Sequence, residues 1–133
     1  MTLHDRLCHA AGGCILLGML VTARLLQPSE FGFGTHEALG LPPCSAITWF
    51  GVPCPTCGMT TSWSYLLRGD LFMSLRCNPG GTCLALVAMV TAVWSLSIAA
   101  LGNYRALLSI RVASLLAILI ASITVVHWLG KIF

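Results

Sequence analysis

The longest uncharged stretch of the chain constrains its fold most strongly. No charged residue occurs from position 78 to position 104, and most of this segment is aliphatic. About twenty apolar residues in a helix are long enough to cross the hydrocarbon core of a bilayer. In lipid, a helix also satisfies all of its own backbone polar groups. We therefore predict a transmembrane helix over residues 82–101.

Two further segments have the same character. Residues 7–26 are apolar apart from His9, Thr22 and Arg24, and residues 112–129 are interrupted only by Ser, Thr and one His. The start of the chain also resembles a signal peptide, but we interpret it as a retained span. The turn signal at 102–103 predicts an antiparallel hairpin of the second and third spans. The fold class expected is an all-α integral membrane protein with three transmembrane helices.

The composition agrees with a membrane location. Only 8% of the 133 residues are charged and 57% are hydrophobic, whereas soluble domains carry about 25% charged residues. The net charge of +3 comes from scattered Lys and Arg without a basic run, which argues against a nucleic-acid partner. We expect a single membrane domain over residues 1–133, with the lipid bilayer as its main surroundings. The basic residues divide three against four between the two sides, so no orientation is predicted.

The segment between the first and second spans is too long for a simple connector. No charge occurs from position 38 to position 67, so this segment is expected against or within the membrane. Irregular backbone at that depth needs protein or a wet cavity around it. We predict a membrane-associated, partly helical loop over residues 36–79, with helical turns at 58–67 and 71–77. Asn78 and Pro79 are expected to cap and open the second span.

The chain has seven cysteines in two groups. Three lie in or beside the apolar helices, at Cys8, Cys14 and Cys83, and are interpreted as packing residues. The other four lie in the loop and are candidates for shared chemistry: Cys44, Cys54, Cys57 and Cys77. Which of these four come together depends on how the loop folds.

A metal site is one hypothesis for the loop cysteines. Cys54 and Cys57 belong to the run Cys-Pro-Thr-Cys-Gly, a knuckle in which two thiolates bind one zinc or iron ion, with zinc–sulfur distances of about 2.3 Å. Cys44 and Cys77 would complete a four-thiolate set if the loop folds back on itself. His36 is a further candidate ligand. Zinc is the cofactor that this pattern favours.

Two other uses of the thiols remain open. In a membrane thiol–disulfide oxidoreductase, Cys54 at a helix start would be activated by the helix dipole and exchange with Cys44. Proteins of the vitamin K epoxide reductase type place a CxxC motif in this way. Alternatively, a disulfide from Cys44 to Cys54 or Cys57 would be a structural staple, provided that the compartment is oxidising.

Several linked motifs resemble those of a family of small bacterial membrane proteins, which are grouped as a domain of unknown function. The family is marked by CPxCGxTR, then Gly-Asp, then Asn-Pro, and this chain has Cys-Pro-Thr-Cys-Gly-Met-Thr-Thr, Gly-Asp and Asn-Pro in that order over residues 41–81. It departs from the pattern at Thr61, where the family has Arg. The resemblance implies a bacterial protein of the inner membrane. It implies no reaction.

The function expected is therefore that of a non-catalytic accessory or interaction subunit. Such a subunit would associate with other membrane proteins or with copies of itself, and the cysteine knuckle would shape its loop, around a metal if one binds. Three spans with few polar groups form no evident transport pathway. An oxidoreductase using Cys54 and Cys57 with Cys44 is the enzymatic alternative.

Overall fold

The computed structural model describes residues 2–102 and 110–133 of the chain. Each regular element in this part is a helix, and α1, α5 and α6 are long and apolar enough to cross a membrane. The elements are α1 (Leu3–Leu25), η1 (Thr35–Leu39), α2 (Ser45–Phe50), α3 (Met59–Leu67), α4 (Leu71–Cys77), α5 (Pro79–Leu101) and α6 (Ile110–Ile132). The predicted all-α membrane fold is confirmed, with three candidate spans and the cysteine-containing segment between the first and the second.

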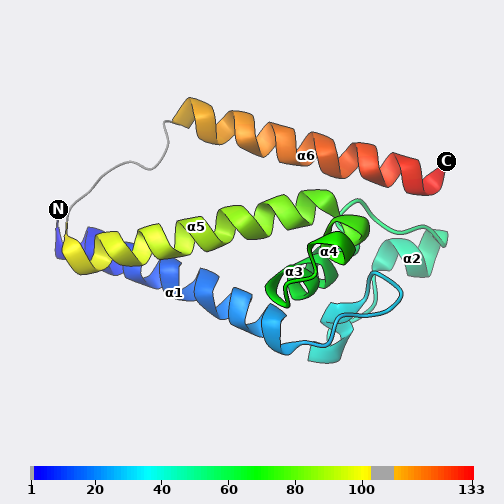
Figure 1. The fold of residues 1–133 in the computed structure, drawn as a ribbon, viewed down its shortest axis with the longest axis horizontal. Coiled ribbons are helices and arrows are strands. Elements are labelled where there is room, and N and C mark those ends of the chain that lie inside the picture. Colours follow the sequence, from blue (N-terminus) through cyan, green and yellow to red (C-terminus); the bar gives the residue numbers. More distant parts are fainter. Residues whose placement is uncertain (1, 103–109) are drawn as a thin grey trace.

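Helices α1 and α5 pack side by side and run in opposite directions (Figure 1). They approach closely at Gly13, where a Cβ atom would lie 2.7 Å from Cγ of Leu96. At the far end, the guanidinium of Arg6 donates hydrogen bonds to the carbonyls of Ala99 and Ala100, at 3.0 and 3.2 Å. A cation at the end of α5 is favourable because the last carbonyls of a helix carry partial negative charge.

The protein core lies between α1, α3 and α5. It is built from Leu20, Ala23, Trp63, Ala85, Ala88 and Ala92. Alanine along one face of α5 lets the neighbouring helix backbones come close, as in other membrane helix pairs. The structure places Trp63 in this core at 8% exposure.

Helix α6 runs antiparallel to α5 (Figure 1), and little of its surface is buried by the rest of the protein. The contact is tight at Gly80, where a Cβ atom would clash with Oγ1 of Thr124. Ala113, Ala117 and Ala121 recur every four residues along α6, and all three are exposed. At the predicted hairpin turn, Gly102 ends α5 with a φ of 68°, while position 103 lies outside the described residues.

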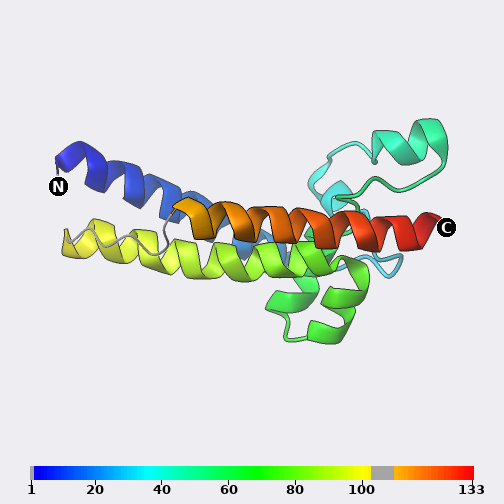
Figure 2. The same ribbon diagram turned by 90° about the horizontal axis from the view of Figure 1, so that it is seen from above.

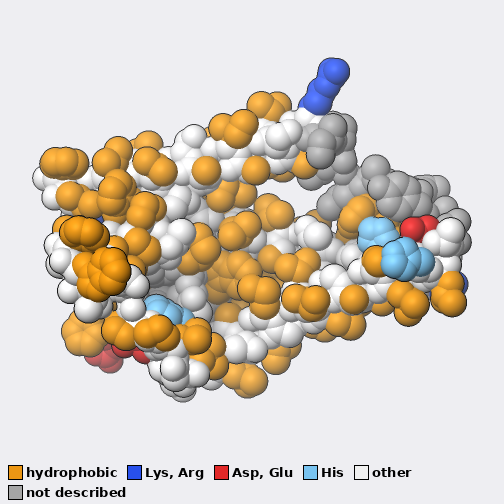
Figure 3. Space-filling model, turned by 180° about the vertical axis from the view of Figure 1, so that it is seen from behind, with side chains coloured by type: hydrophobic (Ala, Val, Ile, Leu, Met, Phe, Trp, Pro, Cys, Tyr) orange, Lys and Arg blue, Asp and Glu red, His pale blue; other side chains and the backbone are white. Residues whose placement is uncertain are grey.

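The short helices gather at the end of the bundle where α1 ends and α5 begins. Figure 2 shows α3 and α4 on one side of the long helices and α2 on the other. Helix α4 begins where the carboxylate of Asp70 accepts the Met73 N–H at 2.9 Å, and α5 begins at Asn78 and Pro79, as expected. Hydrophobic side chains cover the face in Figure 3, with the few charged ones toward the ends of the molecule. Such a surface suits contact with lipid.

Candidate functional site

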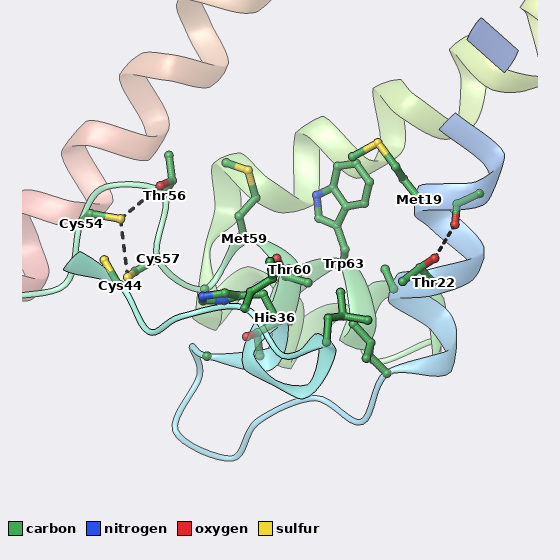
Figure 4. A pocket seen from close by; sticks show the side chains of 18 residues that line it. Met19, Thr22, His36, Cys44, Cys54, Thr56, Cys57, Met59, Thr60 and Trp63 are labelled. Atoms are coloured by element: carbon green, nitrogen blue, oxygen red, sulfur yellow. Dashed lines mark hydrogen bonds between the residues drawn. The ribbon is translucent and has the colours of Figure 1, made fainter. Parts of the chain in front are cut away.

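Three cysteines from two parts of the loop come together. The sulfur atoms of Cys44, Cys54 and Cys57 all lie within 4.8 Å of one another (Figure 4). The Cys54 thiol donates to the sulfur of Cys57 over 3.6 Å, and it shares a 3.1 Å hydrogen bond with the Thr56 hydroxyl. All three cysteines are half-buried and free. This cluster is called the thiol triad below.

The local backbone explains why Cys54 and Cys57 face the same point. The Cys57 N–H donates to the Cys54 carbonyl at 3.0 Å, which closes a tight turn around the intervening residues. Gly58 then takes a φ of +83° before α3 begins, a conformation that glycine adopts without strain. A Cβ atom at Gly58 would also lie 2.6 Å from the Gly32 carbonyl oxygen. The knuckle therefore requires glycine at this position for two reasons.

Cys44 reaches the triad from the start of α2, and its environment differs from that of Cys57. A hydrogen bond from the Ile47 backbone N–H, which outweighs some desolvation, lowers the pKa of Cys44 to about 6. Burial, with a contribution from the hydrogen bond to Cys44, raises the pKa of Cys57 to about 12. The triad therefore combines one thiol that is mainly ionised at neutral pH with one that is protonated.

Asn78 connects the knuckle to the second span. Its side chain is 2% exposed, and its Nδ2 group donates to the carbonyls of Pro55 and Cys57, each at 3.3 Å. Its Oδ1 accepts the Gly81 N–H at 2.9 Å and so caps α5. One buried amide thus holds both the cysteine loop and the start of a transmembrane helix, which makes Asn78 a positioning residue for the site.

The third span is attached to the same loop. Nε1 of Trp128 donates to the Pro53 carbonyl at 2.6 Å, immediately before the first knuckle cysteine. Nζ of Lys131 donates to the Cys77 carbonyl at 2.7 Å. Because α6 has few other buried contacts, these two bonds hold its last turns against the site.

The structure does not bring Cys77 into the triad. Its side chain is buried at the end of α4, where its sulfur lies against Gly32, and burial raises its pKa. The sequence predicts that the remaining cysteines are packing residues. Cys8 and Cys14 are instead exposed on α1. In a bilayer these two side chains would contact lipid. A thiol tolerates that contact because it behaves as a small apolar group. Cys83 is half-buried on α5.

His36, the further candidate ligand, does not join the group of ligand atoms at the triad, and Thr61 lies deeper. The imidazole of His36 lines the same cavity as the three cysteines, and its Nε2 is 3.3 Å from the Pro42 carbonyl oxygen. Thr61, which stands where the resembled family has Arg, is fully buried and shares a 2.8 Å hydrogen bond with the hydroxyl of Thr35. At this position a hydroxyl is satisfied within the protein, whereas a buried guanidinium would need an anionic partner.

Two cavities adjoin the triad and share Cys54 and Cys57 in their walls. The larger, of about 710 Å³, lies between α1, α3 and the loop, and all three cysteines line it. The smaller, of about 270 Å³, is lined by Cys54 and Cys57 together with Asn78, His127 and Lys131. The knuckle cysteines therefore separate a mainly apolar space from a more polar one.

The spacing of the triad is compatible with a bound metal ion. Ligands at about 2.3 Å around a tetrahedral zinc ion lie about 3.8 Å from one another. The Cys54–Cys57 sulfur distance is 3.6 Å, and the remaining pairs are within 4.8 Å. Small side-chain rotations therefore suffice to bring three sulfur atoms to one ion. Zinc fits this donor set, because thiolates select soft or borderline metals.

Sequence reasoning missed the buried polar network that supports the site. Oγ of Ser74 donates to the Ser62 carbonyl and shares a hydrogen bond with the Thr82 hydroxyl, both at 2.7 Å. Oγ of Ser64 donates to the Leu26 carbonyl at 2.7 Å. The available signal was the dense Ser and Thr content of an otherwise uncharged segment. In such surroundings each hydroxyl needs a partner inside the protein.

Comparison with known proteins finds a similarity over part of the chain. A family model described as a protein of unknown function (DUF2752) matches residues 44–92, which run from the first triad cysteine into α5. No curated protein and no solved structure matches the chain. The matched segment thus contains the thiol triad, Asn78 and the first half of the second span, and it is similar to a domain whose function is unknown.

Proposed function

We propose that this chain is a small integral membrane protein whose loop between the first and second spans binds one zinc ion through Cys44, Cys54 and Cys57. The observation that carries the proposal is the convergence of three sulfur atoms from separate parts of the loop within 4.8 Å. Three thiolates leave the fourth tetrahedral position free. His36 lines the same cavity (Figure 4), but its ring nitrogens lie outside the group of ligand atoms within 4.8 Å, so we assign the fourth position to water.

The role we propose for the ion is structural. The loop has several turns and short helices, and a metal tying α2 to the start of α3 restricts its conformations. In such sites the free energy of metal binding is also free energy of folding. The whole chain then acts as a single membrane domain and an accessory subunit, presenting a rigid loop to other membrane proteins or to its own copies in a bacterial inner membrane.

Metal analysis tests this proposal directly. Protein purified in mild detergent is expected to contain about one zinc per chain, as the coordination number of a single site requires. The double variant Cys54→Ser/Cys57→Ser and the single variant Cys44→Ser should lose the ion. Cys77→Ser should retain it, because that sulfur lies outside the triad. Absence of metal from the unmodified chain after zinc addition would refute the site.

The contrast between the thiols also favours a second candidate, thiol–disulfide exchange. Cys54 and Cys57 are in hydrogen-bonding contact, and Cys44 beside them has a pKa of about 6. Oxidation of the pair to a disulfide would pass two electrons and two protons to a partner disulfide, which would become a dithiol. A Cys57→Ser variant of such an enzyme traps a mixed disulfide with its partner. Cys57→Ser also removes a proposed zinc ligand, so the two functions are separated by combining results: zinc in the unmodified chain without a trapped partner in the variant favours the metal site, and a trapped partner without zinc favours exchange.

A further inference from the structure

The larger cavity beside the triad has the size and the lining of a ligand site. Its volume is about 710 Å³, within the range of roughly 300–1,000 Å³ typical of small-molecule pockets. Its walls are formed by the second half of α1 with its C-cap, by residues of the loop, and by the start of α3 as far as Trp63. The first of these walls consists of Gly18, Met19, Thr22, Ala23 and the C-cap Leu26. None of the described residues lining it is Lys, Arg, Asp or Glu. The titratable groups of the lining, His36 and the three cysteines, belong to the loop. The part of the space between α1 and Trp63 therefore suits an uncharged, mainly apolar molecule.

The position of the cavity indicates where such a molecule would come from. Gly18, Met19 and Thr22 belong to the second half of α1, which is long and apolar enough to be a membrane span. The Met19 side chain is 52% exposed, so this wall of the cavity faces the surroundings of the helix rather than the protein interior. In a bilayer those surroundings are lipid, and a ligand can enter sideways from the membrane.

One buried polar group in the wall lacks a partner. The indole of Trp63 is 8% exposed, and its Nε1–H makes no hydrogen bond to any described group. Two other polar groups in the wall have partners: Oγ1 of Thr22 donates to the Gly18 carbonyl at 2.8 Å, and Thr61 is bonded to Thr35. A buried donor without a partner is rare in native proteins. It is explained most simply by an acceptor that the bound state supplies.

Access to this nitrogen depends on Met59. Figure 4 shows the Met59 side chain beside the edge of the indole that carries the nitrogen, and Met59 packs on the core cluster that includes Trp63. Methionine is unbranched and has several rotatable bonds, so it adapts to different neighbours. The Trp63 nitrogen itself has less than 1 Å² of accessible surface, so a ligand reaches it only if Met59 changes its rotamer and opens the nitrogen toward the cavity.

We propose that this cavity binds an uncharged, membrane-soluble carbonyl compound, with its carbonyl oxygen accepting the Trp63 Nε1–H and its apolar body against α1. Two sources in a membrane have this chemistry: the ring of a lipid-soluble quinone and the ester region of a neutral lipid. The thiol triad closes one end of the cavity, so the bound molecule lies next to the proposed metal site. The inference does not require the metal, because α1 and Trp63 form their part of the wall independently.

Two glycines of α1 provide a matched pair of variants. A Cβ atom at Gly18 or at Gly12 would have no neighbouring atom within 4 Å, so both positions accept a larger side chain. Gly18 lines the cavity and Gly12 does not. Gly18→Leu therefore fills the cavity, whereas Gly12→Leu changes the same helix by the same amount elsewhere. The helix-propensity gain from losing glycine cancels between them.

The experiment uses the full chain in nanodiscs of ether-linked phosphatidylcholine, which contains no carbonyl group. Decylubiquinone and dioctanoylglycerol are added separately, with and without zinc, and Tm is followed, because a ligand that binds the folded state raises it. We expect a saturable rise for the unmodified chain and for Gly12→Leu, and at least tenfold weaker binding for Gly18→Leu. Trp63→Phe keeps an aromatic ring without the donor and should bind about three- to tenfold more weakly.

Each outcome decides the proposal. A response to either probe that Gly18→Leu abolishes supports the site, and the probe that acts identifies the quinone or the neutral lipid as the source. If neither probe raises Tm, or if Gly18→Leu responds as strongly as the unmodified chain, the proposed site is overturned. Unchanged binding by Trp63→Phe overturns the role of the indole. Failure of the zinc proposal would appear instead as absent metal with the ligand response intact.

Discussion

Replacing Asn78 with alanine should destabilise the protein and weaken its proposed metal site together. The side chain is 2% exposed and makes three hydrogen bonds, to Gly81, Pro55 and Cys57. Loss of the helix cap costs about 1 kcal/mol. Loss of two long amide bonds to buried carbonyls costs about 0.5–1 kcal/mol each. The free energy of unfolding of Asn78→Ala should therefore fall by about 2–3 kcal/mol.

A second variant separates the two contributions. Asn78→Ser keeps a side-chain oxygen that can cap α5, but it has no amide to reach the cysteine loop. Its free energy of unfolding should fall by only about 1–2 kcal/mol. Both variants should weaken zinc binding to a similar degree, since both release the carbonyls of Pro55 and Cys57.

Urea unfolding in mild detergent, followed by circular dichroism, measures the free energy of unfolding. Competition with a chelator measures the zinc affinity. A change below about 0.5 kcal/mol for Asn78→Ala, as for an ordinary surface substitution, would refute the reasoning. Equal destabilisation by alanine and serine would show that the cap contributes nothing. Unchanged zinc affinity in both variants would remove Asn78 from the site while leaving its structural role.

Two more predictions concern the knuckle itself. With a pKa lowered to about 6, Cys44 in the metal-free protein should be alkylated by iodoacetamide at a rate that is nearly constant above pH 7 and declines as the pH falls through 6. Cys57, with a pKa raised to about 12, should react slowly at every pH. Mass spectrometry of peptides at each pH measures both rates, and a Cys57 that reacts faster than Cys44 would contradict the prediction. Gly58→Ala should lower the free energy of unfolding by more than about 1 kcal/mol, since it forces alanine into a left-handed conformation against a neighbouring carbonyl. The control is Gly130→Ala, whose added Cβ atom meets no atom within 4 Å. Both variants are compared in the same thermal melt, and equal melting temperatures would refute the argument.

Much of the fold was predictable because its signals are local. The three spans follow from the length of uncharged apolar sequence, and their bounds in the structure differ from the predicted 7–26, 82–101 and 112–129 by no more than about one turn. The start of α5 was predictable from Asn78 and Pro79, whose capping and N-terminal roles depend only on the next few residues.

The buried positions and the partners of polar side chains were less predictable. The place of Trp63 in the core depends on α1 and α5 packing around α3, which no local pattern specifies. The bond from Trp128 to the Pro53 carbonyl joins residues 75 positions apart. Such a contact depends on where α6 lies along α5, which the tight approach of Gly80 and Thr124 sets.

The cysteine site shows the same division. The sequence by itself determined that Cys54 and Cys57 face one point, because a tight turn and a following glycine act within a few residues. It also determined that this happens in a membrane protein, because hydrophobic length is a property of the sequence. Only the tertiary structure decided that Cys44 joins them and that Cys77 does not. The physical reason is that those choices depend on how separate helices pack, and no local pattern encodes the path of the chain between them.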